Sequence, residues 1–465
     1  MQGTKRLLAA AALTLAAALP ATGVAAERIQ IHWWHAMSGG LGEGVKEIVK
    51  RFNESQDKYE VVETWKGRYR HLLNQTIAAI RADEQPHFFQ NNETGVITLM
   101  LSGAIAPAEE LLAKHGVTLD KSAYLAPVTN TYTDPNGKLL GMPFNSSTPI
   151  LYVNKTLFDR AGLKELPKTY EDMESQIRTL QASGVEVPRG GKPCGYAFYA
   201  GMWGDLENPM AAHRQFYATN NNGVGGLDAT LVYNERGGFA IEHMKRMKRW
   251  LDEGLAEFGA ESQTDWGSGA LVNFTNGNCL FHIRSTASHA RMEKEATSFE
   301  WTATHLPHNA GVTPANTTIG GAALYVLKGF SDEEYAGVVE FFNLLTSVGI
   351  QKYWHKHTGY VPITKAAYED LKAEGYYRDN PTKELAVIQL LRGGDNPGPA
   401  SRVPRLGNFE NIRIALESEL RKVWAGEQTV ETAMDEAVRR GDAILRRFEK
   451  QNASKAKAAY PTLLQ

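Results

Sequence analysis

Hydroxyl and amide side chains gather between two apolar stretches at residues 141–155, where the sequence reads GMPFNSSTPILYVNK. Residues 141–144 are typical of a strand, residues 145–148 supply Asn, Ser, Ser and Thr, and a second apolar strand ends at Asn154 and Lys155. Small hydroxyl groups in such a place can donate hydrogen bonds into a cleft without filling it. The pattern favours a crossover between two lobes, and the alternative for this stretch alone is an ordinary polar turn ending at Pro149.

Motifs of common catalytic and metal sites are missing from the sequence. It contains no G-x-S-x-G, no G-x-x-x-x-G-K and no H-E-x-x-H. His32 and His35 flank two tryptophans, and His355 and His357 could share one face of a strand, but no cluster of Cys, Asp or Glu accompanies either pair. We therefore expect structural histidines, no metal site and no cofactor.

The N-terminus has the pattern of a secretory signal peptide. Lys5 and Arg6 precede an apolar run at residues 7–19, and small residues follow up to Ala26. The apolar run is shorter than the roughly 20 residues that span a bilayer. We expect cleavage after Ala26 and a soluble protein of the periplasm. Because no cysteine lies near this point, a lipid-modified N-terminus is not expected.

The charge balance excludes several classes of partner. The formal charge is -2 for the full chain, and loss of Lys5 and Arg6 makes the mature chain -4. No basic field is present for nucleic acid or an anionic membrane. Any bound anion must be held locally, by one or two placed cations and by neutral donors. The two cysteines, Cys194 and Cys279, would meet oxidising conditions outside the cytoplasm, but the sequence leaves their pairing open.

Short apolar strands alternate with amphipathic helices along the chain. The spacing predicts strands at residues 29–34 and 59–65, and helices at residues 42–52, 69–81, 332–346 and 430–448, with Thr429 as the N-cap of the last helix. Repeated strand and helix units favour parallel sheets with helices on both faces. The length is sufficient for two lobes with separate cores. Residues 452–465 lose this periodicity and are expected to form a loose tail.

Seven motifs occur in an order that resembles a known family. They are WWHAMSG, WKGRY, NETG, PFNSSTPILYVNK, TIGGAALYVL, HKHTGYVPITKAAY and RLGNFENIR. This order is similar to that of the periplasmic sn-glycerol-3-phosphate-binding proteins of ABC importers, within the extracellular solute-binding proteins of family 1. The tryptophan-rich first motif and the double glycine at 320–321 are shared with binders of many sugars. WKGRY, FNSSTP, TGYVPITKAAY and RLGN followed by Arg413 match the glycerophosphate binders more specifically.

The resemblance implies a type II, maltose-binding-protein-like fold. Two α/β lobes with parallel-rich sheets would be joined by a three-stranded hinge and would close around the ligand. Lobe I would comprise residues 27–145 and 303–355, and lobe II residues 146–302 and 356–451. The implied activity is non-enzymatic. A monomer would capture sn-glycerol 3-phosphate, or glycerophosphodiesters such as glycerophosphocholine, and deliver them to an inner-membrane permease with two transmembrane subunits and ATPase subunits.

The resemblance also implies which residues surround the ligand. They are Tyr69, Glu93, Ser147, Trp203, Ser285, Gly321, Tyr360 and Arg413. Arg413 would bind phosphate oxygens bidentately, with serine, tyrosine and backbone donors completing the shell. Glu93 would repel a phosphate, so we expect it at the opposite end, accepting hydrogen bonds from the glycerol hydroxyls. Trp203 would form a flat wall for the glycerol carbons.

One position departs from the family pattern. Members of the family carry a second tryptophan three residues before the one that matches Trp203, and here this position is Ala200. A lost aromatic wall of this kind is worth about 1 to 3 kcal/mol when fully buried. The extra room favours a larger head group such as that of glycerophosphocholine. Two other functions stay open: a binder of neutral oligosaccharide on the same fold, and a secreted phosphodiesterase.

Overall fold

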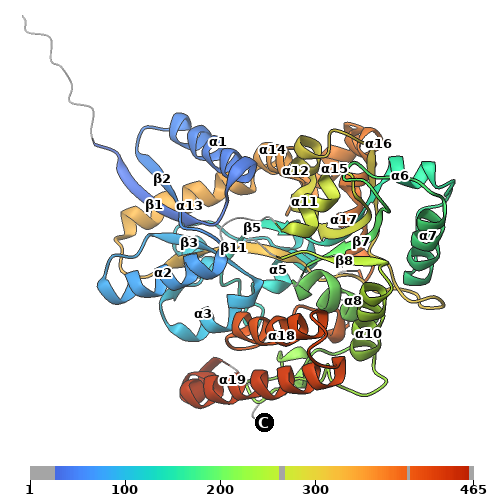
Figure 1. Ribbon diagram of the computed structural model, residues 1–465. Helices are drawn as coiled ribbons and strands as arrows, with labels where there is room; N and C mark the ends of the chain where they lie inside the picture. The colour runs from blue at the N-terminus through green and yellow to red at the C-terminus, as the bar shows by residue number, and fades with distance from the viewer. Residues whose placement is uncertain (1–26, 200, 261–267, 395–397, 460–465) are drawn as a thin grey trace, which may run out of the picture.

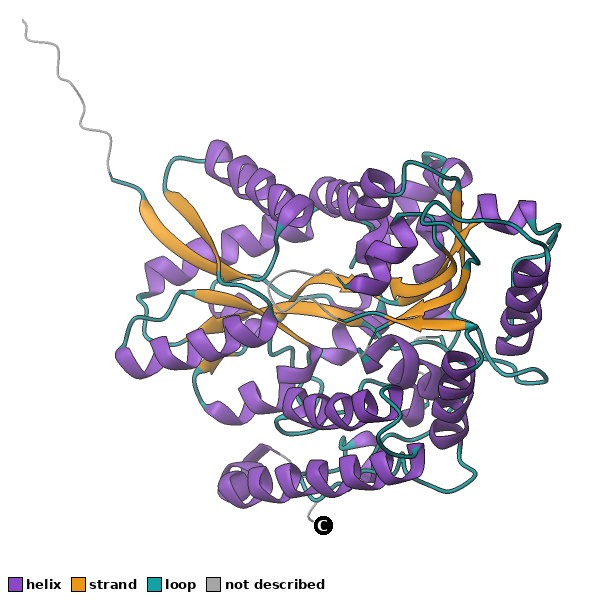
Figure 2. Ribbon diagram, viewed as in Figure 1, coloured by secondary structure: helices purple, strands orange, loops and turns teal. Residues whose placement is uncertain are grey.

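The computed structural model describes residues 27–199, 201–260, 268–394 and 398–459 (Figure 1). Its strands form two mixed sheets, and helices surround both of them (Figure 2). The predicted α/β class with two sheet-centred units is therefore confirmed. The predicted signal peptide and Ala200 lie outside the described residues. Among the residues that are described, no helix combines the length and the apolar character needed to cross a bilayer.

The first sheet has six strands. Its order is β2 (Tyr59–Trp65), β1 (Ile29–His35), β3 (Phe88–Asn92), β11 (Gly320–Leu327) and β4 (Ile105–Ala106), with β5 (Met142–Ser147) also paired to β11. β1 runs parallel to β2 and β3, whereas β11 runs antiparallel to all three of its partners. The alternation predicted for β1 is seen in its burial, because Ile31 and Trp33 are fully buried while Gln30, His32 and Trp34 are exposed or half-buried.

The second sheet has five strands. Its order is β10 (Trp301–Thr304), β6 (Pro149–Asn154), β9 (Cys279–Ser285), β7 (Cys194–Phe198) and β8 (Ala256–Phe258). β7 runs parallel to β8 and β9, but β6 is antiparallel to β9 and β10. The expectation of parallel-rich sheets is thus only partly right. β6 and β11 each follow a change of sheet by the chain, and both run antiparallel to every partner.

The predicted crossover at residues 141–155 is confirmed, and the alternative of a simple polar turn is wrong. β5 belongs to the first sheet and β6 to the second, so the chain changes sheets at Thr148. The hydroxyl-rich residues Ser146 and Ser147 are the end of a strand and are buried. That the hinge has three strands stays a prediction.

Two segments near the predicted lobe boundaries pair or pack as follows. β10 pairs with β6 in the second sheet. Val361, Ile363 and Leu371 pack in the core of the first sheet. The lobe boundaries after residues 145, 302 and 355 stay a prediction.

Helices α1 (Gly39–Ser55), α2 (Tyr69–Ala82) and α13 (Asp332–Thr346) cover the first sheet. Figure 1 shows α1 above and α2 below strands β1 to β3. α13 has the predicted bounds, since Ser331 caps it in a reciprocal capping box with Glu334. Further helices of the two units are α3 (Val96–Ser102), α4 (Ala108–Lys114), α5 (Ala126–Thr131), α6 (Lys155–Arg160), α8 (Asn208–Ala212), α9 (Thr219–Asn222), α11 (Gly269–Thr275), α12 (His289–Glu295), α14 (Val348–Thr358), α15 (Lys365–Ala373), α16 (Tyr376–Asp379) and α17 (Pro381–Leu391).

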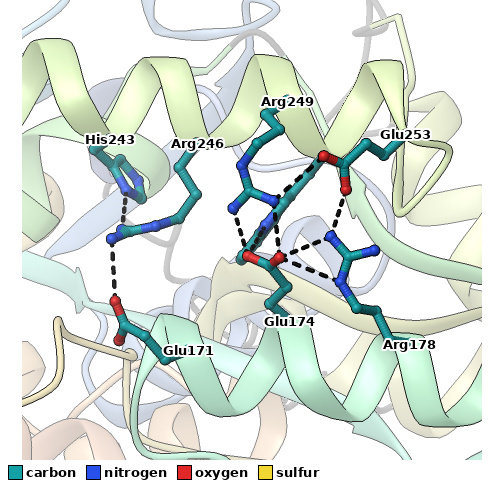
Figure 3. A network of polar contacts seen from close by, with 8 residues as sticks. Glu171, Glu174, Arg178, His243, Arg246, Arg249 and Glu253 are labelled. Atoms are coloured by element: carbon teal, nitrogen blue, oxygen red, sulfur yellow. Dashed lines mark hydrogen bonds and ion pairs between the residues drawn. The ribbon is translucent and has the colours of Figure 1, made fainter.

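A network of ion pairs joins α7 (Tyr170–Ala182) to α10 (Phe239–Asp252) on the second unit (Figure 3). Glu174 accepts hydrogen bonds from Arg249 at 2.8 and 2.5 Å and from Arg178 at 2.8 Å. These hydrogen bonds lower the pKa of Glu174 to about 2, with Arg249 as the largest cause. The network holds two helices of the second unit against each other.

The C-terminal helix α19 (Val430–Ala459) passes from one unit to the other. Its first half packs in the core of the second sheet beside α18 (Phe409–Trp424). Farther along, Phe448 packs against Ile97 and Leu101 of α3, and Lys455 Nζ donates to the Leu101 carbonyl at 2.9 Å. In Figure 1, α19 lies below α18 at the bottom of the molecule.

The ends of α19 test two predictions. Thr429 is its N-cap as predicted, because the Thr432 amide donates to Thr429 Oγ1 at 3.2 Å. The loose tail is wrong for residues 452–459, which are helical. Residues 460–465 lie outside the described part of the chain. The stretch before them is rich in Ala and Lys, which favour helix even without an apolar stripe.

Candidate ligand-binding site

A cavity of about 870 Å³ lies where the two units meet, and residues of both line it. The starts of α1 and α2 come from the first unit, while the end of β9, α12 and α18 come from the second. All eight residues named by the sequence resemblance line this one cavity: Tyr69, Glu93, Ser147, Trp203, Ser285, Gly321, Tyr360 and Arg413. The fold therefore brings together residues from eight separate segments. Their role in binding stays a prediction.

Two glycines allow the strands of the crossover to approach each other. Gly320 and Gly321 on β11 pair with Ser147 and Ser146 on β5. Gly321 has a φ of +102°, and a Cβ there would lie 1.8 Å from the Asn145 carbonyl oxygen. Only glycine can occupy this position without moving β5. Ser147 is thereby held at the edge of the cavity on a strand that has no room to shift.

Two tyrosine hydroxyls face the cavity from the first core. Asn145 Nδ2 donates to Tyr69 Oη at 2.8 Å, and Gln90 Nε2 donates to Asn145 Oδ1 at 2.6 Å, which fixes the orientation of the amide. Trp354 stacks on Tyr360 with ring centroids 5.8 Å apart. Burial raises the pKa of Tyr360 to about 12 and also raises the pKa of Tyr69. Both hydroxyls stay protonated at neutral pH and can act as donors.

The second unit contributes a serine and a tryptophan. Ser285 ends β9 opposite Pro149, and its Oγ accepts from the Ala287 amide at 3.2 Å, so the hydroxyl retains a proton to donate. Trp203 begins η3, a one-turn π-helix (Trp203–Glu207). A Cβ on Gly320 would lie 2.4 Å from the Trp203 ring, so the glycine lets this ring rest directly on β11. Trp203 thus touches both units.

Arg413 on α18 is held by two buried carboxylates. Its Nε and Nη2 donate to the two oxygens of Glu207 at 2.7 and 2.6 Å, and Nη2 also lies 2.9 Å from Glu93 Oε1. The side chains are 11%, 3% and 4% exposed, respectively. Burial opposes the charge on Arg413, but the carboxylates outweigh it and raise its pKa. Burial raises the pKa of Glu93 more than Arg413 lowers it.

The expectation that Glu93 lies opposite Arg413 is wrong. The short helix η1 (Glu93–Gly95) packs against α18, and this contact places the two side chains in an ion pair. A carboxylate with so little exposure needs a cation beside it. With Glu207 added, two carboxylates surround one guanidinium, so this end of the cavity carries one net negative charge when all three groups are ionised.

Glu207 was not predicted from the sequence, although it holds Arg413 in place. It lies four positions after Trp203, and nothing in the sequence around it marks it as buried. Arg284 was also not predicted. It lines the cavity, and its guanidinium lies 4.5 Å from the ring centroid of Tyr199, the neighbouring aromatic that could compensate for the missing tryptophan and that also lines the cavity. Ala200, the position of the missing tryptophan, lies outside the described residues.

The two cysteines form a disulfide between the neighbouring strands β7 and β9, which settles the pairing that the sequence left open. Among the described residues, the one group close enough together to hold a metal is Cys194, Glu257 and Cys279. Because the two sulfur atoms are bonded to each other, they offer no thiolate to a metal.

The histidine pair at 355 and 357 lies on helix α14, so the two side chains do not share one face of a strand. His355 Nδ1 lies 2.7 Å from the Tyr360 carbonyl oxygen, and His357 Nε2 lies 2.9 Å from the Gly40 carbonyl oxygen. Both rings are used to position backbone near the cavity. His35 accepts a hydrogen bond from the Met37 amide on Nδ1 at 3.2 Å, and its Nε2 lies 2.6 Å from Glu63 Oε2.

A family profile described as bacterial extracellular solute-binding protein matches residues 47–382. The chain belongs to this family. The chain is 38% identical over 429 residues to the sn-glycerol-3-phosphate-binding periplasmic protein UgpB of Yersinia pseudotuberculosis, and the alignment covers 91% of this chain and 94% of that protein. The protein of the same name from Rhizobium meliloti is 38% identical over 419 residues, covering 90% and 94%.

Solved structures of solute-binding proteins share the fold. UgpB from Mycobacterium tuberculosis in complex with glycerophosphocholine has a TM-score of 0.74 and 20% identity, and covers 90% of this chain and 98% of that one. The maltose-bound MalE3 of T. maritima has a TM-score of 0.68 and 16% identity, covering 90% and 99%. These likenesses confirm the maltose-binding-protein-like fold, and at such identities they carry nothing about the ligand.

Proposed function

We propose that the protein is the substrate-binding component of an ABC importer that captures sn-glycerol 3-phosphate, glycerophosphodiesters such as glycerophosphocholine, or both. One observation carries this function: the eight residues implied by the sequence resemblance line a single cavity between the two units. The relatives from Yersinia pseudotuberculosis and Rhizobium meliloti, which are sn-glycerol-3-phosphate-binding proteins, support the same class of ligand. The protein has no catalytic role in this proposal.

The geometry favours a particular orientation of the ligand. Both oxygens of Glu207 accept hydrogen bonds from the Nε edge of Arg413, and Glu93 lies beside the same guanidinium. A phosphate at Arg413 would be repelled by these two carboxylates. The phosphate instead lies among the neutral donors, which are the hydroxyls of Tyr69, Tyr360, Ser147 and Ser285 and the backbone at Gly321.

The glycerol hydroxyls then lie at Glu93 and Arg413, where a paired acid and base can accept and donate hydrogen bonds. Trp203 forms the apolar wall beside the glycerol carbons. This assignment keeps the predicted contact of Glu93 with hydroxyls. It replaces the predicted role of Arg413, because the guanidinium meets the polyol and not the phosphate.

The cavity also has room beyond a glycerophosphate. Its volume of about 870 Å³ lies near the upper end of the range for small-molecule sites. From Ser285 and Tyr69 the lining continues to α12 and the start of α1, so the alcohol of a phosphodiester would extend in this direction. Glycerophosphocholine is therefore included among the proposed ligands.

The location and partners follow from the same proposal. The protein works in the periplasm after cleavage of its signal peptide, as a monomer, and delivers the ligand to a permease with two transmembrane subunits and ATPase subunits. The ligand binds the closed form of the protein more tightly than the open form and so raises the population of the closed form. A permease that recognises the closed form therefore selects the loaded protein.

Isothermal titration calorimetry of the mature protein tests the function. Glycerol 3-phosphate and glycerophosphocholine are titrated side by side, with maltose as a neutral control. We expect at least one phosphate compound to bind and maltose to give no heat. Binding of maltose alone would overturn the phosphate proposal and leave a binder of neutral oligosaccharide on the same fold.

A further inference from the structure

Glu207 is a buried carboxylate, and within the described part of the chain its side-chain oxygens accept hydrogen bonds from Arg413 alone. It comes from η3, the segment that begins with Trp203, and it is 3% exposed. Its two oxygens accept from Nε and Nη2 of Arg413 at 2.7 and 2.6 Å, in the paired geometry that arginine forms with carboxylates. Glu207 itself does not line the cavity, so it acts on a ligand through Arg413.

The bond to Glu207 changes what Arg413 can bind. Without it, Arg413 and Glu93 would form a neutral pair with a free donor edge, which is the geometry that binds a second carboxylate or a phosphate. With it, that edge is filled, and the group of three carries one negative charge when all three groups are ionised. A ligand group at this end must then be neutral, because an added anion would face an excess negative charge in a poorly solvated site.

We propose that Glu207 determines specificity at the glycerol end of the cavity by excluding ligands that carry an anion there. The proposal rests on the function proposed above. This exclusion would distinguish two phosphate esters of nearly equal size. sn-Glycerol 3-phosphate ends in a neutral hydroxymethyl group, whereas 3-phosphoglycerate has a carboxylate at the same carbon. The cleft accepts the first and rejects the second, a form of selection by repulsion.

Calorimetric titration of both esters into the wild-type protein and Glu207→Gln tests this exclusion. Glutamine keeps the size of the side chain and removes its charge. We expect the wild type to bind 3-phosphoglycerate at least about 100-fold more weakly than glycerol 3-phosphate, and Glu207→Gln to narrow this ratio about tenfold or more, chiefly through tighter binding of 3-phosphoglycerate.

Glu419→Gln is the matched control. Glu419 lies on α18 with Arg413, is 2% exposed and pairs with Lys422 and Arg440, but it does not line the cavity. The ratio of the two affinities should stay at its wild-type value in this variant. If Glu419→Gln narrows the ratio as Glu207→Gln does, the effect comes from general loosening of α18 and the proposal fails.

A second variant decides the outcome if Glu207→Gln does not fold, which circular dichroism and thermal unfolding would show. Glu207→Asp keeps the charge with a shorter side chain, so it should still reject 3-phosphoglycerate. Equal binding of both esters by the wild type, or an unchanged ratio in Glu207→Gln, overturns the specificity role alone. Failure of the wild type to bind glycerol 3-phosphate overturns the proposed function and this inference together.

Discussion

Asp205 is a buried carboxyl group whose ionisation should destabilise the folded protein. It lies on η3 between Trp203 and Glu207 and is 2% exposed. Tyr196 Oη donates to Asp205 Oδ1, and among the described residues Oδ2 has no hydrogen-bond partner. Burial raises the pKa of Asp205 to about 7 from 3.8, although the Tyr196 hydrogen bond and the charge of Arg284 both act to lower it.

The difference between the folded and unfolded pKa values of Asp205 sets the size and the sign of its effect on the free energy of unfolding. The folded pKa lies above the unfolded value, so Asp205 contributes its full stability below pH 3.8, and this contribution is lost as the pH rises through about 7. About three pKa units correspond to an upper limit of about 4 kcal/mol in the free energy of unfolding. Asp205→Asn cannot ionise, so it should become more stable relative to the wild type by a few kcal/mol as the pH rises from acidic to alkaline.

Urea unfolding of the ligand-free protein, followed by circular dichroism at about pH 4.5 and about pH 8.5, measures this difference. Glu419→Gln is the control. Burial raises the pKa of Glu419, but Lys422, Gln428 and Arg440 outweigh it and lower the pKa. Its stabilising effect is present above pH 4.5 and is lost only below that value, so the difference between the wild type and Glu419→Gln should change little between the two pH values of the assay.

Two results would refute the reasoning on Asp205. One is a difference between the wild type and Asp205→Asn that does not change with pH. The other is a change of the same sign in Asp205→Asn and Glu419→Gln, because this would mean that the pH dependence belongs to the whole protein and not to these two groups.

Three further predictions concern the cavity and the second sheet. Gly320→Ala should push the Trp203 ring off β11 and weaken the binding of glycerol 3-phosphate about tenfold, measured by calorimetry, with little change in Tm; unchanged affinity would contradict the role of this contact. Arg413→Ala should lower the free energy of unfolding by about 3 to 5 kcal/mol in urea, because it leaves two carboxylates buried without a cation; a variant that loses binding at full stability would contradict this. Replacing Cys194 and Cys279 by serine should cost up to about 4 kcal/mol, since the disulfide closes a loop of 85 residues; equal stability of the double variant and the oxidised wild type would speak against it.

Much of the fold could be predicted because local patterns determine it. β2 and α13 have the predicted bounds, since alternating apolar residues in the first and a capping box in the second mark their ends in the sequence. The crossover at Thr148 was also predictable. The direction of β6 and β11 was not, because it depends on how the chain enters a sheet from the other unit.

The site was predictable as a set of residues but not as a set of contacts. The resemblance named eight residues that line one cavity. The ion pair between Glu93 and Arg413 depends on how η1 meets α18, two segments that are far apart in the sequence. Glu207 was missed for a related reason: a buried acidic residue looks like a surface residue until the cation that pairs with it is known.

The path of α19 limits how the two units can rotate against each other. The β5–β6 connection joins the units near the middle of the molecule, and the contact of α19 with α3 joins them at the bottom (Figure 1). A rotation that keeps both attachments must have its axis near the line between them, and displacement grows with distance from an axis. The widest displacement then belongs to elements that lie far from this line on either side, such as α2 on the left and α7 on the right of Figure 1.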